Sequence, residues 1–343
     1  MNSKNCFDFL RFFFAVNVLM AHLSELSQSE DLSFLSHFFN AIIGIKGFFV
    51  ISGFLVAKSY VNTPSLKEYF VKRASRILPA YSAVILISTF VFSLFSANSF
   101  SEYFSNSTTY HYLGWNLVFL NFLQPCLPGL FENNLLCAVN GALWTLKIEV
   151  GFYLTLPFIF FGIKKTKKPF LVLGTLYVLS LIYWFVMESY FDNPLLAKQL
   201  PGYLSYFVTG ILLFLRFEWI MKYKKIIFAL SVLVLISFYF LSIETSFLYP
   251  AAFGCMVIIA AYNIPFLNNF GKYGDFTYGL YIYHFPIIQL FRQYDLFEKY
   301  NPFAAAISVI LVTLLFAILS WFFIERRFLR RFSTHQKQIP NVC

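Results

Sequence analysis

Long apolar runs separated by short polar segments dominate the chain. Ten of these runs approach the ~20 residues that a helix needs to cross about 30 Å of hydrocarbon. They lie at residues 7–24, 38–58, 79–97, 142–163, 169–188, 199–216, 225–241, 245–262, 276–293 and 302–324. The pattern predicts an all-α, polytopic integral membrane protein with about ten transmembrane helices.

Two apolar stretches need a separate interpretation. The first run resembles a signal peptide, but it is too long for the apolar core of one, contains Asp8 and Arg11, and lacks a cleavage pattern. We therefore interpret it as a membrane anchor. Residues 110–123 are apolar but too short to span, so we expect an interfacial or re-entrant helix on the outer side.

The distribution of basic residues orients the predicted spans. Lysines and arginines gather in alternate connections, as in residues 164–168 and 326–331, whereas the other connections carry mostly acidic residues. Because cytoplasmic connections are enriched in Lys and Arg, this pattern predicts that both termini are cytoplasmic. An even number of spans agrees with that prediction.

Composition excludes several other classes of protein. The chain is 59% hydrophobic and 12% charged, whereas a soluble protein is about 25% charged. Disorder requires low hydrophobicity, and the net charge of +10 is not gathered on a polar face that would bind nucleic acid. We expect one transmembrane domain over residues 1–331 and a short cytoplasmic tail over residues 332–343.

Ionisable residues inside predicted spans are the first candidates for function, because the membrane makes them costly. Arg11 and His22 are eleven residues apart, which places them on one helix face about 16.5 Å apart. Arg11 could instead reach the headgroups, and His22 could be an interfacial histidine bonded to a neighbouring helix. Glu25, three residues after His22, could orient its ring or be solvated.

Three further candidates carry open alternatives. Glu149 is predicted at roughly the depth of His22, and it needs a partner such as His22 or Lys147; a structural ion pair is the alternative. His284 lies before Pro286 in its run, where packing and catalysis are equally compatible with the sequence. Ser52 lies among small residues, which favours a helix contact over a nucleophile.

Two segments outside the spans also carry candidate chemistry. Arg73 and Arg76 lie one helical turn apart in residues 71–81, predicted as a cytoplasmic loop; they suit bidentate phosphate binding or ordinary cytoplasmic charge. Cys126 and Cys137 both fall in the predicted outer segment, where an oxidising exterior could join them. Nothing has the spacing of metal ligands, so no metal is expected.

These residues together resemble the acyltransferase 3 family of integral-membrane acyltransferases. Arg11 and His22 look like its first-helix signature, Phe48-Phe49-Val50-Ile51-Ser52-Gly53-Phe54 looks like its second motif, and Arg73-x-x-Arg76 its third. Trp144-Thr145-Leu146-x-x-Glu149-x-x-Phe152-Tyr153 is similar to a later element. Tyr278-Gly279-Leu280-Tyr281 with His284, and Ile324-Glu325-Arg326, resemble the last two spans. Lys46 departs from the family, many members of which carry an acidic residue there, and we assign it no role.

The resemblance implies a standalone enzyme in the bacterial cytoplasmic membrane. The family transfers an acyl group, usually acetyl, from a cytoplasmic thioester such as acetyl-CoA to a hydroxyl on the far side. Typical acceptors are sugars of O-antigen, capsule or exopolysaccharide, free or lipid-linked. The bilayer is the other expected partner, nucleic acid is not one, and a homo-oligomer is left open.

Residue roles follow from the resemblance together with the residue chemistry. Arg11, Arg73 and Arg76 would hold the donor's phosphates. His22 would be the general base or, in a variant mechanism, an acyl carrier, and Glu149 would orient His22 or bind the acceptor. Motif residues and additional candidates complete the predicted site: Phe48, Phe49, Ser52, Gly53, Trp144 and Tyr153, then Glu25, Tyr281 and His284.

Two rival functions remain compatible with the sequence. Intramembrane charges also suit a transporter or flippase, although no inverted repeat is visible. An acyltransferase that acts on a lipid, a peptide or a small metabolite would carry the same motifs.

Overall fold

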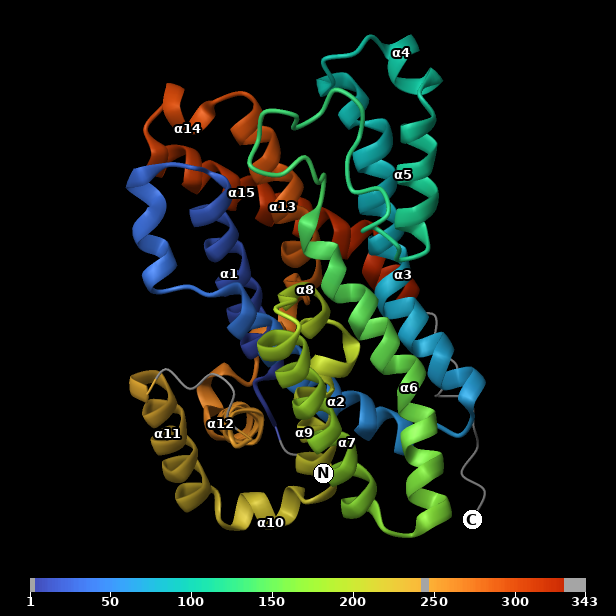
Figure 1. Cartoon of the computed structure of the whole chain (residues 1–343), viewed down its shortest axis with the longest axis vertical. Helices are drawn as coiled ribbons and strands as arrows, with labels where there is room; N and C mark the ends of the chain where they lie inside the picture. The colour runs from blue at the N-terminus through green and yellow to red at the C-terminus, as the bar shows by residue number, and fades with distance from the viewer. Residues whose placement is uncertain (1–3, 242–246, 330–343) are drawn as a thin grey trace. The chain divides into compact units, whose positions relative to one another are not determined.

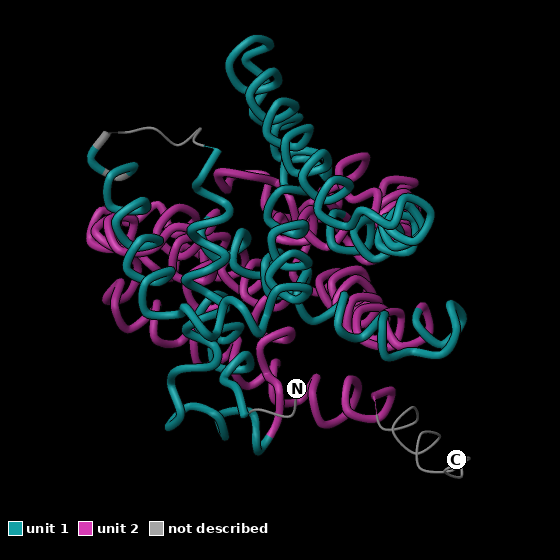
Figure 2. The backbone as a smooth tube through the Cα atoms, turned by 90° about the horizontal axis from the view of Figure 1, so that it is seen from below, with its two compact units in different colours: residues 1–14, 43–69, 148–273 teal, residues 15–42, 70–147, 274–343 magenta. Residues whose placement is uncertain are grey.

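The computed structural model describes residues 4–241 and 247–329, and its described residues form helices and connecting segments with no strand (Figure 1). The predicted tail, residues 332–343, lies outside the described residues. By compactness the chain divides into two units, coloured in Figure 2. Unit 1 comprises residues 1–14, 43–69 and 148–273, and unit 2 comprises residues 15–42, 70–147 and 274–343.

Helices account for every predicted span. The longer ones are α1 (Phe7–Leu26), α2 (Ala41–Val61), α3 (Leu66–Phe90), α6 (Trp144–Thr166), α7 (Pro169–Phe185), α9 (Leu200–Leu215), α11 (Lys224–Leu241), α12 (Tyr249–Asn263), α13 (Thr277–Gln293) and α15 (Pro302–Ser320). The shorter ones are α4 (Phe100–Ser105), α5 (Ser107–Leu117), α8 (Pro194–Ala197), α10 (Phe217–Lys222) and α14 (Leu296–Lys299). Short 3-10 or π segments include η1 (Glu30–His37), η3 (Gly141–Leu143), η4 (Val186–Tyr190) and η7 (Trp321–Glu325).

Among the described residues, six helical segments are long and apolar enough to cross a membrane. They are Phe7–Leu26, Ala41–Val61, Leu66–Phe95, Gly141–Thr166, Pro169–Tyr190 and Pro302–Leu329. A seventh would be the pair Tyr249–Asn263 and Pro265–Tyr273, bent by 74°. Helices α9 and α13 have 16 and 17 residues, below the ~20 of a simple span. The protein is thus a multi-pass helical membrane protein, and the full count of ten stays a prediction.

One predicted boundary was wrong. Residues 71–81, expected to form a loop, lie inside α3, which begins at Leu66 and continues through Pro79. The predicted span began only at residue 79 because the charged residues before it were taken as a loop. A helix can nevertheless continue through basic residues beyond the apolar core, since their long side chains reach solvent. Arg73 and Arg76 therefore project from a helix.

Unit 1 is built on close contacts between α2, α6 and α9. Phe49 packs edge-on against Phe152 at 5.1 Å, and Phe152 stacks on Phe207 at 4.5 Å between ring centroids. Gly53 faces the backbone carbonyl of Phe207 so closely that a Cβ would collide with it. Small residues let membrane helices approach in this way. The motif around Phe49 and Gly53 is therefore a packing element of unit 1.

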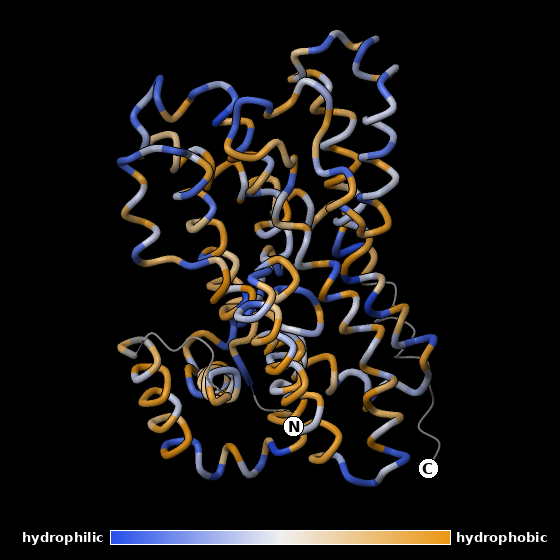
Figure 3. The backbone as a smooth tube through the Cα atoms, in the orientation of Figure 1, coloured by the Kyte–Doolittle hydropathy of each residue, from blue (hydrophilic) through white to orange (hydrophobic). Residues whose placement is uncertain are grey.

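Unit 1 also contains the strongly apolar helices α7 and α11, which Figure 3 shows mainly in the hydrophobic colour. The turn between α6 and α7 is hydrophilic in the same view and carries the lysines of residues 164–168. α7 packs on α9, and α11 packs on α12. Many apolar side chains of α7 and α11 are exposed, as expected of helices in hydrocarbon; examples are Leu171, Leu179, Leu230 and Leu233.

In unit 2, α13 packs mainly against α15 and receives η3 near its middle. Gly279 lies directly against the backbone of Ala317, which brings these two helices together. Residues 118–140, between α5 and η3, are joined to α13 by a buried amide: Gln289 donates to the carbonyls of Leu136 and Ala138 at 2.6 and 2.8 Å. Helix α5 occupies most of the predicted interfacial stretch 110–123.

The hypothesised disulfide is present in unit 2, in the connection between α5 and η3. Cys126 and Cys137 are bonded, with their Cα atoms 5.3 Å apart. This confirms the bond hypothesised from their shared position in the predicted outer segment. The bridge closes the part of the chain that contacts Gln289 of α13.

Candidate active site

A pair of histidines lies at the centre of the candidate site in unit 2. Nδ1 of His22, from α1, is 2.8 Å from Nε2 of His284, from α13. The two rings are nearly parallel, at 12°, and the Phe285 ring meets the His22 ring edge-on at 5.3 Å. His284 is fully buried and His22 is partly exposed. The structure therefore gives His22 a partner that the sequence did not single out for it.

Side chains of residues 140–145 hold helix α13 in place near His284. Proline has no N–H, so Pro286 leaves the carbonyl of Ile282, four residues earlier, without a helical donor. The side-chain amide of Asn140 donates to that carbonyl at 2.7 Å. At the residue directly before Ile282, the hydroxyls of Tyr281 and Thr145 are 2.6 Å apart and buried. These bonds hold His284 in place.

The Thr145–Tyr281 contact also joins two of the family-like motifs. Thr145 follows Trp144 in one motif, and Tyr281 closes the Tyr278-Gly279-Leu280-Tyr281 motif. This contact places Tyr281 beside His284, and the centroids of the two rings are 6.0 Å apart. Glu25, expected either to orient His22 or to be solvated, is exposed on α1.

A second polar group lies elsewhere in unit 2. Arg76 of α3 donates to Asp275, immediately before α13, at 2.5 Å. Tyr278 fastens the same two elements, since its hydroxyl donates to the carbonyl of Ile77 at 3.1 Å. Glu325 of η7, 2% exposed, accepts from Ser320 and lies within electrostatic range of Arg76. Three motifs that are distant in sequence therefore converge on Arg76.

Asp275 is the residue that sequence analysis missed. Its only signal was an isolated carboxylate directly before an apolar run, at an end predicted to be cytoplasmic and otherwise basic. Such a position calls for a cationic partner, but the sequence alone did not identify Arg76 over a separation of 199 residues. Arg73 lies one turn from Arg76 on the same helix and is half-buried.

Glu149 and Arg11 belong to unit 1. The hydroxyl of Tyr153 donates to Oε1 of Glu149 at 2.5 Å, which joins two residues of one predicted motif. Lys147, predicted as an alternative partner of Glu149, belongs to unit 2, where its ammonium lies 4.6 Å from the centroid of the Phe122 ring. Arg11 lies 3.6 Å from Asp8. The predicted pairing of Glu149 with His22 stays a prediction.

The second-helix motif has a packing role in unit 1. Phe48 is half-buried and Phe49 buried on α2. Ser52 is 7% exposed, and within the described structure its hydroxyl is not hydrogen-bonded. Lys46, to which we assigned no role, lies over the rings of Tyr206 and Tyr249, at 5.6 and 4.8 Å from their centroids. A desolvated ammonium gains a cation–π contact there.

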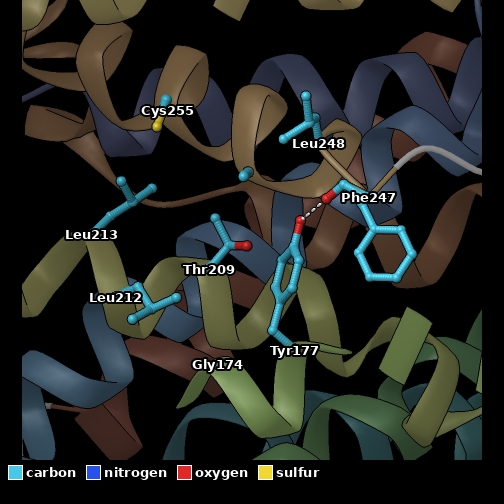
Figure 4. Close-up of a pocket in the computed structure, with 9 residues that line it drawn as sticks. Gly174, Tyr177, Thr209, Leu212, Leu213, Phe247, Leu248 and Cys255 are labelled. Atoms are coloured by element: carbon cyan, nitrogen blue, oxygen red, sulfur yellow. Dashed lines mark hydrogen bonds between the residues drawn. The ribbon is translucent and has the colours of Figure 1, made fainter. Parts of the chain in front are cut away.

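An apolar pocket of about 260 Å³ also lies in unit 1, between α7, α9 and α12 (Figure 4). Tyr177 crosses it, and its hydroxyl donates to the carbonyl of Phe247. The hydroxyl of Thr209 is bonded within its own helix to Ser205. The lining contains none of the predicted site residues. This pocket suits an apolar group and offers no acid–base pair.

Comparison with known proteins identifies the class to which this arrangement belongs. The model of the acyltransferase 3 family, described as an acyltransferase domain, matches residues 4–322. The chain therefore belongs to this family and is a membrane acyltransferase. No solved structure matches it.

Three relatives illustrate the family. The O-acetyl transferase of Shigella phage Sf6 is 28% identical over 97% of this chain and 98% of its own length. Nodulation protein 10 of Rhizobium leguminosarum bv. viciae is 26% identical over 83% of both chains. The O-acetyltransferase OatA of Staphylococcus aureus is 27% identical over 93% of this chain but 56% of its own length.

Proposed function

We propose that this protein is an O-acetyltransferase that moves acetyl from cytoplasmic acetyl-CoA to a sugar hydroxyl of a cell-envelope polysaccharide on the outer side of the bacterial cytoplasmic membrane. The observation that carries the proposal is the contact between His22 and His284 inside an acyltransferase fold. A neutral histidine whose ring is held by a second ring is suited to act as a general base. Relatives named O-acetyl transferase support acetyl and oxygen as the group and the acceptor atom.

Donor binding is assigned to the arginines. Arg73 and Arg76 lie one turn apart on α3, and Arg11 lies near the start of α1. Guanidinium groups bind phosphate oxygens bidentately. His22 follows Arg11 on the continuous helix α1, about 16.5 Å further along its axis. The pantetheine arm of acetyl-CoA is of comparable length, so the thioester would reach His22 while the nucleotide end stays at the arginines.

The reaction then needs one base and one leaving-group acid. His22 removes the proton of the sugar hydroxyl as its oxygen attacks the thioester carbonyl. Glu149, with Tyr153 donating to it, would bind the acceptor or orient His22. The acyl group passes from the thioester to the new ester without a change in its oxidation state.

The test compares surface glycans from cells with the intact gene, without the gene, and with His22→Ala. We expect both defective strains to lose acetyl mass from glycans of normal length. His37→Ala is the matched control, since His37 is an exposed histidine at the end of η1, and acetylation should persist there.

Three results would redirect the proposal. Full acetylation by an inserted His22→Ala protein would exclude His22 as the base. Unchanged acetylation with missing or shortened glycan would favour a transporter or flippase. Loss of acetyl from a lipid, peptide or small metabolite, with unchanged glycans, would keep the enzyme class and change the acceptor. Slow hydrolysis of acetyl-CoA by the purified protein without acceptor separates either enzyme from a transporter.

A further inference from the structure

The hydrogen bonds of the buried histidine fix which of its nitrogens carries the proton. Nδ1 of His284 lies 3.1 Å from the carbonyl oxygen of Leu280, one turn earlier on α13. A carbonyl only accepts, so Nδ1 must donate. A neutral imidazole has a single N–H. Nε2 of neutral His284 therefore carries a lone pair and accepts.

The same reasoning assigns the protonated nitrogen of the His22 ring. Nε2 of His284 is 2.8 Å from Nδ1 of His22. Since Nε2 of His284 accepts, Nδ1 of His22 donates, and the lone pair of neutral His22 is placed on Nε2. We propose that His284 is a positioning residue that sets the tautomer of His22, so that Nε2 of His22 is the basic atom and marks where the acceptor hydroxyl binds. This inference rests on the proposed function for the role of His22.

Several contacts hold in place the relay, by which we mean the hydrogen bonds from the carbonyl of Leu280 through His284 to His22. His284 is fully buried, and its helix is held by Asn140 on the carbonyl of Ile282 and by Thr145 on Tyr281. Phe285 lies edge-on against the His22 ring. Because the carbonyl of Leu280 belongs to the helix backbone, the direction of the relay does not depend on any other ionisable side chain. A neutral ring as the orienting group also avoids burying a second charge in the membrane.

The chemistry balances through this single atom. Nε2 of His22 takes the proton of the acceptor hydroxyl while the hydroxyl oxygen forms a bond to the thioester carbonyl carbon. The carbon–sulfur bond then breaks, and the proton on Nε2 passes to the departing thiolate, giving the ester and the free thiol. In between, the Nδ1–H of the imidazolium stays bonded to Nε2 of His284, and this hydrogen bond stabilises the positive charge.

The tautomer is directly measurable by ¹⁵N NMR on the full chain, labelled at histidine and held in lipid nanodiscs. His22 is assigned as the signal lost in His22→Gln. We expect Nδ1 of His22 to carry the proton and Nε2 to show the shift of an unprotonated nitrogen, with a coupling from Nδ1 of His22 to Nε2 of His284. In His284→Leu this bias should disappear. A wild-type His22 protonated at Nε2 would overturn the inference.

Activity provides the second readout. His284→Leu removes the acceptor, and we expect acyl transfer to fall by about a hundredfold or more, the range seen when an acid–base group is lost or held in the wrong tautomer. His284→Gln offers a side-chain oxygen that accepts from Nδ1 of His22, so it should recover a large part of the rate. Acetyl-CoA binding should be unchanged in both variants, because His284 is not assigned to the donor's phosphates.

Gln293→Leu is the matched control for helix α13. It removes hydrogen bonds of that helix to the amide of Phe131 and the carbonyl of Phe95 without touching either histidine. Transfer by its folded fraction should stay near the wild-type rate. If His284→Gln transfers acetyl no faster than His284→Leu, while both insert and bind acetyl-CoA normally, the role of His284 is confined to packing. If His22→Ala itself transfers acetyl, the proposed base fails, whereas the NMR result still reports the tautomer.

Discussion

Arg76 of α3 donates to the carboxylate of Asp275 at 2.5 Å, across 199 residues of sequence. The contact pairs an arginine proposed to bind the donor's phosphates with a competing anion. A guanidinium has five N–H donors, and this bond involves one terminal nitrogen. Phosphate binding by Arg76 must therefore proceed beside a carboxylate, and the two effects can be separated by mutation.

We expect Arg76→Ala to weaken acetyl-CoA binding by about tenfold, since a hydrogen bond to a charged group contributes roughly 1.5–3 kcal/mol. Asp275→Asn should not weaken that binding, because it removes a negative charge near the phosphates, but it should lower the melting temperature. Titration of acetyl-CoA into nanodisc-held protein measures the first quantity, and thermal unfolding the second. If the double variant Arg76→Ala/Asp275→Asn regains both the affinity for acetyl-CoA and the melting temperature of the wild type, Arg76 acts only through its ion pair with Asp275.

The base and acyl-carrier mechanisms predict different fates for labelled acetyl. With His22 as a general base, we expect no label on the protein after rapid quench with labelled acetyl-CoA in the absence of acceptor. An acyl-carrier mechanism would leave one labelled histidine, which His22→Ala removes. Protein-bound label at His22 that is discharged on adding acceptor would establish the covalent mechanism.

The disulfide predicts a count of reactive thiols. The chain has five cysteines, and Cys126 and Cys137 are joined, so alkylation of the denatured, unreduced protein should modify three and alkylation after reduction five. The bridge closes a short loop, and its loss should cost about 2–3 kcal/mol. Cys126→Ser should therefore lower the melting temperature, whereas Cys255→Ser, at a free cysteine of α12, should change it little. Five modified thiols before reduction would contradict the bridge.

The sequence predicted elements better than it predicted partners. Each apolar run became a helix, because backbone groups in hydrocarbon must be satisfied within the segment. The start of α3 was misplaced because charge was taken as a loop signal, whereas Arg73 and Arg76 extend the helix. Residues close in sequence or in one loop, such as Cys126 and Cys137, could be paired in advance.

The partners of the candidate site residues could not be predicted. His22 and His284 are 262 residues apart, and no local pattern in one histidine specifies the other. Asp275 was overlooked for the same reason, since its role depends on which helix lies against it. Tyr281 and His284 were singled out only as candidates, and their contacts depend on how α13 is held by residues 140–145.

Prolines inside helices explain two long-range hydrogen bonds, from Tyr69 to Tyr153 and from Asn140 to Ile282. Pro157 lies within α6 and leaves the carbonyl of Tyr153 without a helical donor, just as Pro286 does for Ile282. In each case a side chain from another segment supplies the missing bond: the hydroxyl of Tyr69 donates to Tyr153 at 2.9 Å, and Asn140 donates to Ile282 at 2.7 Å. In hydrocarbon an unsatisfied carbonyl is costly, so these side chains substitute for the absent N–H.

This relationship makes a reciprocal prediction. Tyr69→Phe should destabilise the protein by about 1–3 kcal/mol, the cost of leaving a buried acceptor unsatisfied. In a Pro157→Ala background the same change should cost much less, because the new N–H of residue 157 donates to the carbonyl of Tyr153. Equilibrium unfolding in mixed detergent and SDS gives the four free energies of the cycle. Tyr81→Phe is the control: its hydroxyl donates to Asn116 at 2.8 Å, an acceptor that Pro157 does not create, so Pro157→Ala should leave its cost unchanged. Equal costs for Tyr69→Phe in both backgrounds would show that its hydroxyl does not replace the proline's missing donor.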